Sequence, residues 1–247
     1  MVSGLSLVPG GGMARGPDGA GDPVRAGFEQ PVGIIGKRWR LPGADGGGNR
    51  SPTLAELFAS SPRDGGWAGF LLGQVDVQRP LLWVQERMAI LESGRVHPPG
   101  FAFADLIHVE ARDAKSALWA MEEGLRCAAI GAVIGEIWGD PAALDFTATR
   151  RLAVAAERHG VAAYLVRLGG TVNLSAARLR WRVASAPSLM HPLNPRAPGV
   201  AAWQAELFRA RGSPPGTWRL NDEANRLHLV ADPVDRTVGQ AVLKQAG

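Results

Sequence analysis

The chain has 247 residues, of which 46% are hydrophobic, so it is long and apolar enough for one substantial α/β domain with a small appendage. Its 27 Lys and Arg residues against 23 Asp and Glu residues give a formal charge of +4, which permits a nucleic acid or an acidic protein as partner but does not require one. The single cysteine, Cys127, excludes an intramolecular disulfide and a cysteine-rich zinc site. No apolar run of about 18 residues predicts a membrane span, so we expect a cytoplasmic protein.

Residues 1–52 are rich in glycine and proline and have little periodic apolar pattern. Such a segment buries too little apolar surface to offset the entropy lost on ordering, so we predict that it is largely flexible. Within it, residues 32–35 are consistent with a short strand or an anchoring contact.

From residue 53 onward, apolar runs of strand length alternate with segments of helical spacing. The predicted strands are 81–85, 106–110, 132–134 and 161–166, while 53–59 fits either a strand or a helical turn. The predicted helices are 67–75, 86–92, 114–130 with Asp113 as its N-cap, and a helix that begins at Asp140 or Thr147 and ends at Gly160. This alternation predicts an α/β fold with a mostly parallel sheet flanked by helices.

The pattern changes after residue 177. In 178–183 the residues Arg178, Arg180 and Arg182 alternate with apolar ones, which predicts a half-exposed strand near a sheet edge. The segment 186–200 holds four prolines and is predicted to be an extended linker.

The last part of the chain predicts a β-meander. Three short runs, 202–210, 217–220 and 226–230, are separated by turn sequences, and a short helix is expected from residue 235. The predicted organisation is therefore a flexible segment 1–52, a core 53–185, a Pro-rich linker 186–200, and a C-terminal β-meander with a tail 201–247.

Several segments resemble a known family. They read PLLWVQ, RVHPPGF, EGLRCAAIGAVIGE, RRLAVAAERHGVAAYLVR, LSAARLRWRVASAP, WQAELFRARGSPPGTWRL and RLHLV, and they span roughly residues 54–230. With their order along the chain, they resemble the RecA-like fold and, more closely, the ImuA family of bacterial mutasome proteins. The resemblance implies a RecA-like core and a role in SOS-induced translesion DNA synthesis and mutagenesis. The implied partners are ImuB, a Y-family-like polymerase homologue, and an error-prone replicative-type DNA polymerase.

The resemblance places a degenerate nucleotide site in this chain. A working phosphate loop needs glycines, a lysine and a Ser or Thr that holds Mg²⁺. The corresponding stretch reads ASSPRDGGW, with Gly65 at the lysine position, Gly66 at the hydroxyl position, and Asp64 adding an acid. Arg63 is the one cation that could replace the lysine.

Two further residues belong to this site by resemblance. Glu136 stands at the position of the Walker B acid, and Arg167 follows the strand that usually ends in a nucleotide-sensing residue. Because the loop has lost its lysine and gained a carboxylate, we expect neither ATP nor Mg²⁺ as a cofactor and no ATPase activity.

Partner-contact candidates come from arginines and tryptophans. The face formed by Arg178, Arg180 and Arg182 could hold DNA phosphates or an acidic partner, or it could simply be solvated. Trp138, Trp203 and Trp218 are candidate interface anchors, whereas Trp83, Trp119 and Trp181 are predicted to be core.

The sequence offers no candidate residues for a metal site or for a hydrolase. The histidines have no metal-ligand spacing, no G-x-S-x-G motif occurs, and Cys127 lies on a predicted buried helix. The loop 168–174 is too short for the strand pairing of a recombinase. We therefore expect a non-catalytic accessory protein that works through protein contacts, in the cytoplasm and at the nucleoid when engaged. Two alternatives remain open: an ATP-dependent DNA-binding protein with an atypical phosphate loop, and a simple single-stranded DNA binder.

Overall fold

The computed structural model describes residues 5–9, 53–75, 79–97, 105–211, 214–222 and 227–229. The strands are β1 Leu5–Pro9, β2 Leu54–Ala59, β3 Leu81–Glu86, β4 Asp105–Ala111, β5 Ala132–Trp138, β6 Ala162–Leu168, β7 Leu179–Ala186, β8 Ala202–Ala210, β9 Gly216–Asp222 and β10 Leu227–Leu229. The helices are α1 Gly66–Leu72, α2 Arg87–Ser93, α3 Ala114–Leu125 and α4 Phe146–His159. None of the helices in these ranges has the length and apolarity needed to cross a bilayer.

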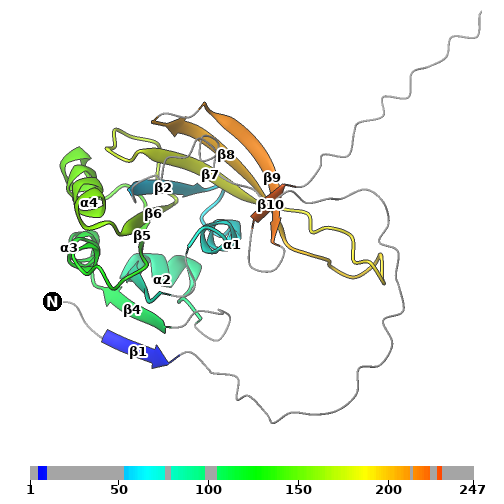
Figure 1. Cartoon of the computed structure of the whole chain (residues 1–247), viewed down its shortest axis with the longest axis horizontal. Helices are drawn as coiled ribbons and strands as arrows, with labels where there is room; N and C mark the ends of the chain where they lie inside the picture. Colours follow the sequence, from blue (N-terminus) through cyan, green and yellow to red (C-terminus); the bar gives the residue numbers. More distant parts are fainter. Residues whose placement is uncertain are drawn as a thin grey trace, which may run out of the picture.

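One sheet organises the described part of the chain, in the order β1-β4-β3-β5-β6-β2-β7-β8-β9-β10 (Figure 1). The six strands from β4 to β7 in this order are parallel, whereas β1 at one edge and β8 to β10 at the other are antiparallel. The predicted α/β fold, a mostly parallel sheet flanked by helices with a C-terminal β-meander, is confirmed.

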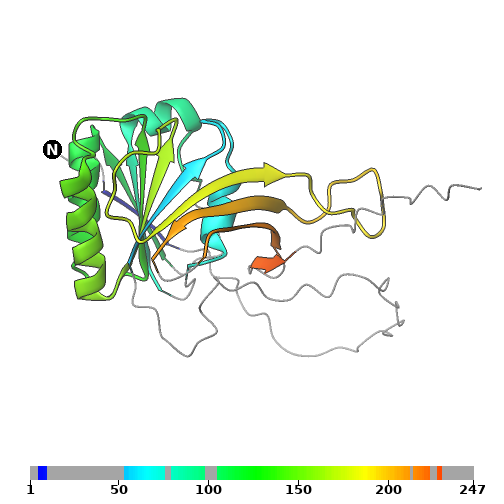
Figure 2. The ribbon, with the colours of Figure 1, turned by 90° about the horizontal axis from the view of Figure 1, so that it is seen from above.

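Helices cover both faces of the sheet and create two apolar cores (Figure 2). On one face α3 and α4 pack on residues such as Val84, Val133 and Leu165. On the other, α1 and α2 pack on residues such as Trp83, Ile134 and Trp181. The central strands are buried on both faces, which explains why they appear in the sequence as short continuous apolar runs.

Helix ends differ in part from the prediction. Asp113 caps α3 as expected, with its carboxylate accepting the Ser116 N–H at 2.7 Å, and Gly160 ends α4 in a left-handed conformation. However, α4 is capped by Asp145, and neither Asp140 nor Thr147 starts it.

The predicted helix 114–130 is too long. The chain leaves α3 after Leu125 through short-range turns, such as Cys127 N–H to Gly124 O at 3.1 Å, because it must reverse before β5 begins at Ala132. Cys127 is therefore exposed rather than buried, and Trp119, predicted to be core, is 55% exposed.

The described residues among the first 52 form a strand that the sequence did not predict. Residues 5–9 form β1, which pairs antiparallel with β4. The predictions for residues 32–35 and for a helix from residue 235 lie outside the described residues.

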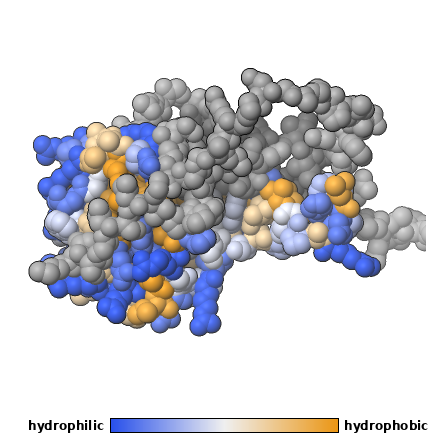
Figure 3. Space-filling model, turned by 90° about the horizontal axis from the view of Figure 1, so that it is seen from below, coloured by the Kyte–Doolittle hydropathy of each residue, from blue (hydrophilic) through white to orange (hydrophobic). Residues whose placement is uncertain are grey.

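The C-terminal strands continue the core sheet. β7 pairs with β2 on one side and with β8 on the other, so 178–183 is an interior strand and not an edge strand. The Pro-rich segment 186–200 is the connection between β7 and β8, and it projects from the body of the molecule (Figure 2). Met190 and Leu193 of this segment are exposed. The space-filling view shows apolar surface toward the projecting end of the described residues (Figure 3).

Candidate functional site

The loop between β2 and α1 is closed by the side chain of Asp64. One carboxylate oxygen accepts hydrogen bonds from the Gly66 N–H at 2.9 Å and the Ser185 hydroxyl at 2.5 Å. The other accepts the Ser185 N–H at 2.9 Å and the Ser60 hydroxyl. Partial burial alone would raise the pKa of Asp64, but these hydrogen bonds outweigh it and lower the pKa to about 2. An ionised carboxylate therefore occupies the loop that the resemblance assigns to phosphate binding.

Gly66, which the resemblance assigns to the metal-binding hydroxyl position, has no room for a side chain. A Cβ on Gly66 would lie 2.6 Å from the Ser185 backbone nitrogen and 2.9 Å from its Cα. Neighbouring Gly65 has open space around it. The end of β7 thus packs directly against the start of α1, and a Ser or Thr at residue 66 cannot be accommodated without moving backbone.

Glu136 lies within β5, two residues before its end, and its side chain is buried. It is therefore not an exposed carboxylate in the loop after the strand. Its carboxylate accepts the indole N–H of Trp83 at 2.5 Å and the amide of Gln85 at 3.0 and 3.1 Å. Burial raises the pKa of Glu136 to about 7, although these two hydrogen bonds act in the opposite direction.

Gln85 links this carboxylate to the next loop and strand. Its carbonyl accepts the Val96 N–H at 2.9 Å and lies 3.0 Å from His108 Nε2, while its amide also donates to the Gly94 carbonyl at 3.1 Å. Glu136 therefore belongs to a connected polar network of neutral donors across β5, β3 and β4.

Asp64 and Glu136 both line a cavity of about 240 Å³. Its lining includes four of the residues predicted for the nucleotide site: Arg63, Asp64, Gly65 and Glu136. Two of the lining groups are carboxyl groups, whereas the side chains that would bind a polyphosphate and its metal are replaced by glycines. The structure thus brings the predicted loop and acid together in one cavity, where the guanidinium groups of Arg63 and Arg95 also belong to the lining.

Arg167 lies elsewhere. It projects from β6 to the opposite face of the sheet, where it pairs with Asp140 and lies 3.7 Å from Glu56. Arg180 of β7 donates to the same Glu56 at 2.7 Å. Both guanidinium groups lie over the ring of Phe58, each at 5.4 Å from its centroid.

Each arginine of the predicted basic face is paired within the chain. Arg180 is buried with Glu56, Arg178 donates to Glu157 at 2.7 Å, and Arg182 lies 3.1 Å from Glu206. The predicted face is thus not a row of free cations, and Arg180 is not exposed.

The tryptophans have different environments. Trp203 is 6% exposed and packs on Gly69 of α1, so it is core and not a surface anchor. The ring centroid of Trp218 lies 6.0 Å from that of the buried Trp181. Trp138 is half-buried, and its backbone N–H donates to the Glu86 carboxylate at 2.9 Å. Trp83 and Trp181 are in the core, as predicted.

The described ranges contain no group of three or more His, Cys, Asp or Glu side chains arranged to hold a metal ion. Sequence reasoning also missed functional partners that are far apart in the chain. Ser185 binds Asp64 across 121 residues, and nothing in the local sequence signals that contact.

Comparison with known proteins identifies the relatives. Protein ImuA of Caulobacter vibrioides strain NA1000 / CB15N is 35% identical over 176 residues, which cover 65% of this chain and 70% of the relative. Protein ImuA of strain ATCC 19089 / CIP 103742 / CB 15 matches with the same figures. The chain belongs to the ImuA family. No protein-family profile matches the chain. Membership of the ImuA family supports a mutasome-associated accessory role in general terms.

Proposed function

We propose that this ImuA-family protein is a non-catalytic accessory factor of SOS-induced translesion DNA synthesis. It acts by contacting polymerase components, namely an ImuB-like Y-family polymerase homologue and an error-prone replicative-type DNA polymerase. The proposal also holds that neither ATP nor Mg²⁺ is a cofactor.

The observation that carries the proposal is the carboxylate of Asp64 in the phosphate loop. It accepts the Gly66 N–H, a donor of the type that binds phosphate in a working loop, and two donors from Ser185. A bound polyphosphate would have to displace these bonds and approach a fixed negative charge without a lysine to offset it.

The environment of Glu136 supports the same conclusion. A Walker B acid needs a charged carboxylate that reaches the metal's water shell. Here the carboxylate is 2% exposed and engaged by Trp83 and Gln85. Its role in this proposal is to complete a buried network.

The decisive test is ATP turnover by the full-length protein, with and without single-stranded DNA. We expect no turnover above that of a buffer control and no binding of a fluorescent ATP analogue. Turnover that disappears in Glu136→Gln would overturn the proposal in favour of an ATP-dependent DNA-binding protein. Turnover that survives this change would indicate a contaminating ATPase.

The second test is co-purification of the full-length protein with its mutasome polymerase components. We expect a stable complex whose yield does not depend on added nucleotide. A protein that binds single-stranded DNA but neither polymerase component would instead support a simple DNA binder.

A further inference from the structure

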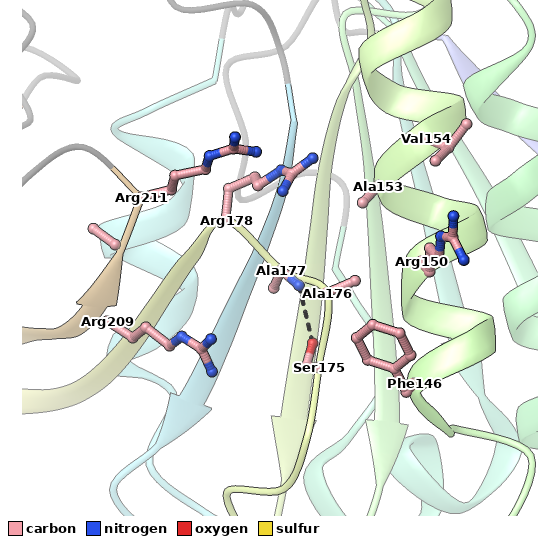
Figure 4. Close-up of a pocket in the computed structure, with 11 residues that line it drawn as sticks. Phe146, Arg150, Ala153, Val154, Ser175, Ala176, Ala177, Arg178, Arg209 and Arg211 are labelled. Carbon is pink, nitrogen blue, oxygen red and sulfur yellow. Dashed lines mark hydrogen bonds between the residues drawn. The ribbon is translucent and has the colours of Figure 1, made fainter.

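A second cavity, of about 580 Å³, lies at the other end of the strands from Asp64. It is bordered on one side by α4 and on the other by the start of β7 and the end of β8 (Figure 4). Four arginines line it: Arg150 from α4, Arg178 just before β7, and Arg209 and Arg211 from the end of β8 and just beyond it. We call this cavity the arginine pocket.

The charges of the arginine pocket are largely uncompensated. Glu157 accepts the guanidinium of Arg178 at 2.7 and 3.3 Å. The hydrogen bond from Arg178 lowers the pKa of Glu157, and the charges of Arg178 and Arg211 act in the same direction. In the part of the chain that the structure describes, no carboxylate forms an ion pair with Arg150, Arg209 or Arg211. One carboxylate thus serves four guanidinium groups.

The arginine pocket also has an apolar side. Phe146 and Val154 of α4, 41% and 51% exposed, line it together with small residues such as Ala153 and Ala177. Figure 4 shows the Phe146 ring on the α4 side and Arg209 and Arg211 on the strand side. A ligand lying between the two sides would meet guanidinium groups and an apolar surface at once.

A neighbouring cavity between α3 and α4 shares Arg150 and Val154 but is a poorer anion site. Its Glu122 already pairs with Arg126 at 3.2 Å and with Arg151 at 3.4 Å. Each cavity is lined by four arginines; among the described residues, three in the arginine pocket have no ion pair, against two, Arg150 and Arg158, in its neighbour.

We propose that the arginine pocket binds an acidic peptide segment of a partner protein, with carboxylates on the guanidinium groups and an apolar side chain against Phe146 and Val154. Guanidinium groups bind carboxylates in two-point contacts, and arginine with an aromatic is a frequent composition of peptide-binding hot spots. Single-stranded nucleic acid is less favoured because its binding grooves use successive aromatic rings for base stacking, whereas Phe146 is the one aromatic residue among the described residues that line this pocket. The inference deepens the proposed function, on which it rests, by specifying a docking site for a mutasome partner.

The test uses the full-length chain and fluorescence anisotropy with three labelled probes: a peptide of alternating glutamates and leucines, its glutamine counterpart, and an oligothymidine. We expect the glutamate peptide to bind best. The double change Arg209→Glu, Arg211→Glu should weaken that binding about tenfold or more, because desolvated charge pairs contribute at least about 1.4 kcal/mol in total. Phe146→Ala should weaken it about threefold or more without removing the dependence on glutamate.

The matched control is Arg182→Glu, which changes charge at an exposed arginine outside the pocket and should leave peptide binding within about twofold. Circular dichroism checks that the variants are folded. The inference is overturned if the glutamate peptide does not bind, if the double variant binds it as well as the wild type does, or if oligothymidine binds more tightly and is lost in the same variant. ATP turnover and co-purification are measured separately, so a failure of this site differs from a failure of the proposed function.

Discussion

At the scale of single residues, Asp64 and Glu136 line the same cavity and have opposite pKa shifts. Asp64 is held ionised by four hydrogen bonds from Ser60, Gly66 and Ser185. Glu136 is buried, and burial favours its neutral form. Each carboxyl therefore contributes to stability in a different range of pH.

Asp64→Asn should destabilise the protein at pH 7 by about 1–2 kcal/mol, because an amide replaces an acceptor of four hydrogen bonds in a partly exposed site. The native pKa of about 2 lies below the ordinary value of 3.8, so the wild type should lose this contribution as pH falls from about 4 to about 2. Urea unfolding across this range measures the difference. In Asp64→Asn the free energy of unfolding should not show this fall between about pH 4 and pH 2. Asp105→Asn, at an exposed aspartate, is the control and should show the same fall as the wild type.

Glu136→Gln should increase stability relative to the wild type as pH rises. The unfolded chain releases its proton near pH 4.5, while the native state holds it to about pH 7, so the wild type loses stability between these values. The relative gain should reach about 1–3 kcal/mol at pH 8. Equal pH profiles for the two proteins would contradict the burial of this carboxyl, and Glu123→Gln on the exposed side of α3 is the control.

At the scale of elements, α1 and β7 meet where a phosphate loop would open. Ser185 supplies two donors to Asp64 and packs its backbone on Gly66. The same contact removes the space for a hydroxyl and fills the donor positions of the loop.

Gly66→Ala should destabilise the protein by about 1–3 kcal/mol, because the added methyl group would press on the Ser185 backbone at 2.6 Å. Gly65→Ala is the matched control and should change stability by less than about 1 kcal/mol, since no atom lies within 4 Å of its Cβ position. The double change Gly65→Lys, Gly66→Thr should therefore lower the melting temperature and not create ATP binding. Tight ATP binding by that variant would show that sequence alone, and not packing, closes the site.

A buried charge cluster joins three strands of the sheet. Glu56 on β2 lies between Arg167 on β6 and Arg180 on β7, and all three side chains are 3% exposed or less. Glu56→Gln should cost about 3–5 kcal/mol in thermal unfolding, because it removes the carboxylate partner of buried Arg180 and one of the two carboxylates near buried Arg167, which keeps Asp140. Glu206→Gln, which breaks the exposed pair with Arg182, should cost less than about 1 kcal/mol.

At the scale of the whole molecule, the antiparallel strands complete the fold begun by the parallel ones. Trp203, Leu207 and Leu220 belong to the same apolar core as Trp83 and Trp181. Removing β8 to β10 would expose that core and leave β7 paired with β2 but without β8 on its other side.

A chain truncated after Ser185 should therefore lack a cooperative thermal transition, whereas the full-length protein should unfold in one. Near-ultraviolet circular dichroism would follow the loss of tryptophan packing. A sharp transition in the truncated chain would show that residues 53–185 fold independently. Single-residue variants in the arginine pocket are for this reason better probes of partner binding than truncation.

The sequence predicted the strand and helix order well because buried strands appear as short apolar runs between glycine and proline turns. Its errors arise where distant residues decide the outcome. Arg180 looked like part of a solvated face, but its partner Glu56 is 124 residues away. The apolar pattern beyond Leu125 predicted that the helix continues to residue 130, but the chain turns after Leu125 and begins β5 at Ala132. The arginine pocket combines α4 with the ends of β7 and β8, and no local motif signals such a combination.

The closed state of the Asp64 loop also bears on how complexes of this protein would be regulated. A tethered carboxylate is always present beside its donors, so its effective concentration does not follow the level of any metabolite in the cell. Under the proposed function, this loop neither binds a nucleotide nor releases a product, so it would offer no step that could drive a cycle between two conformations. Complexes built on this chain would then be governed by the amounts of the proteins made and removed, in the manner of a scaffold and not of a motor.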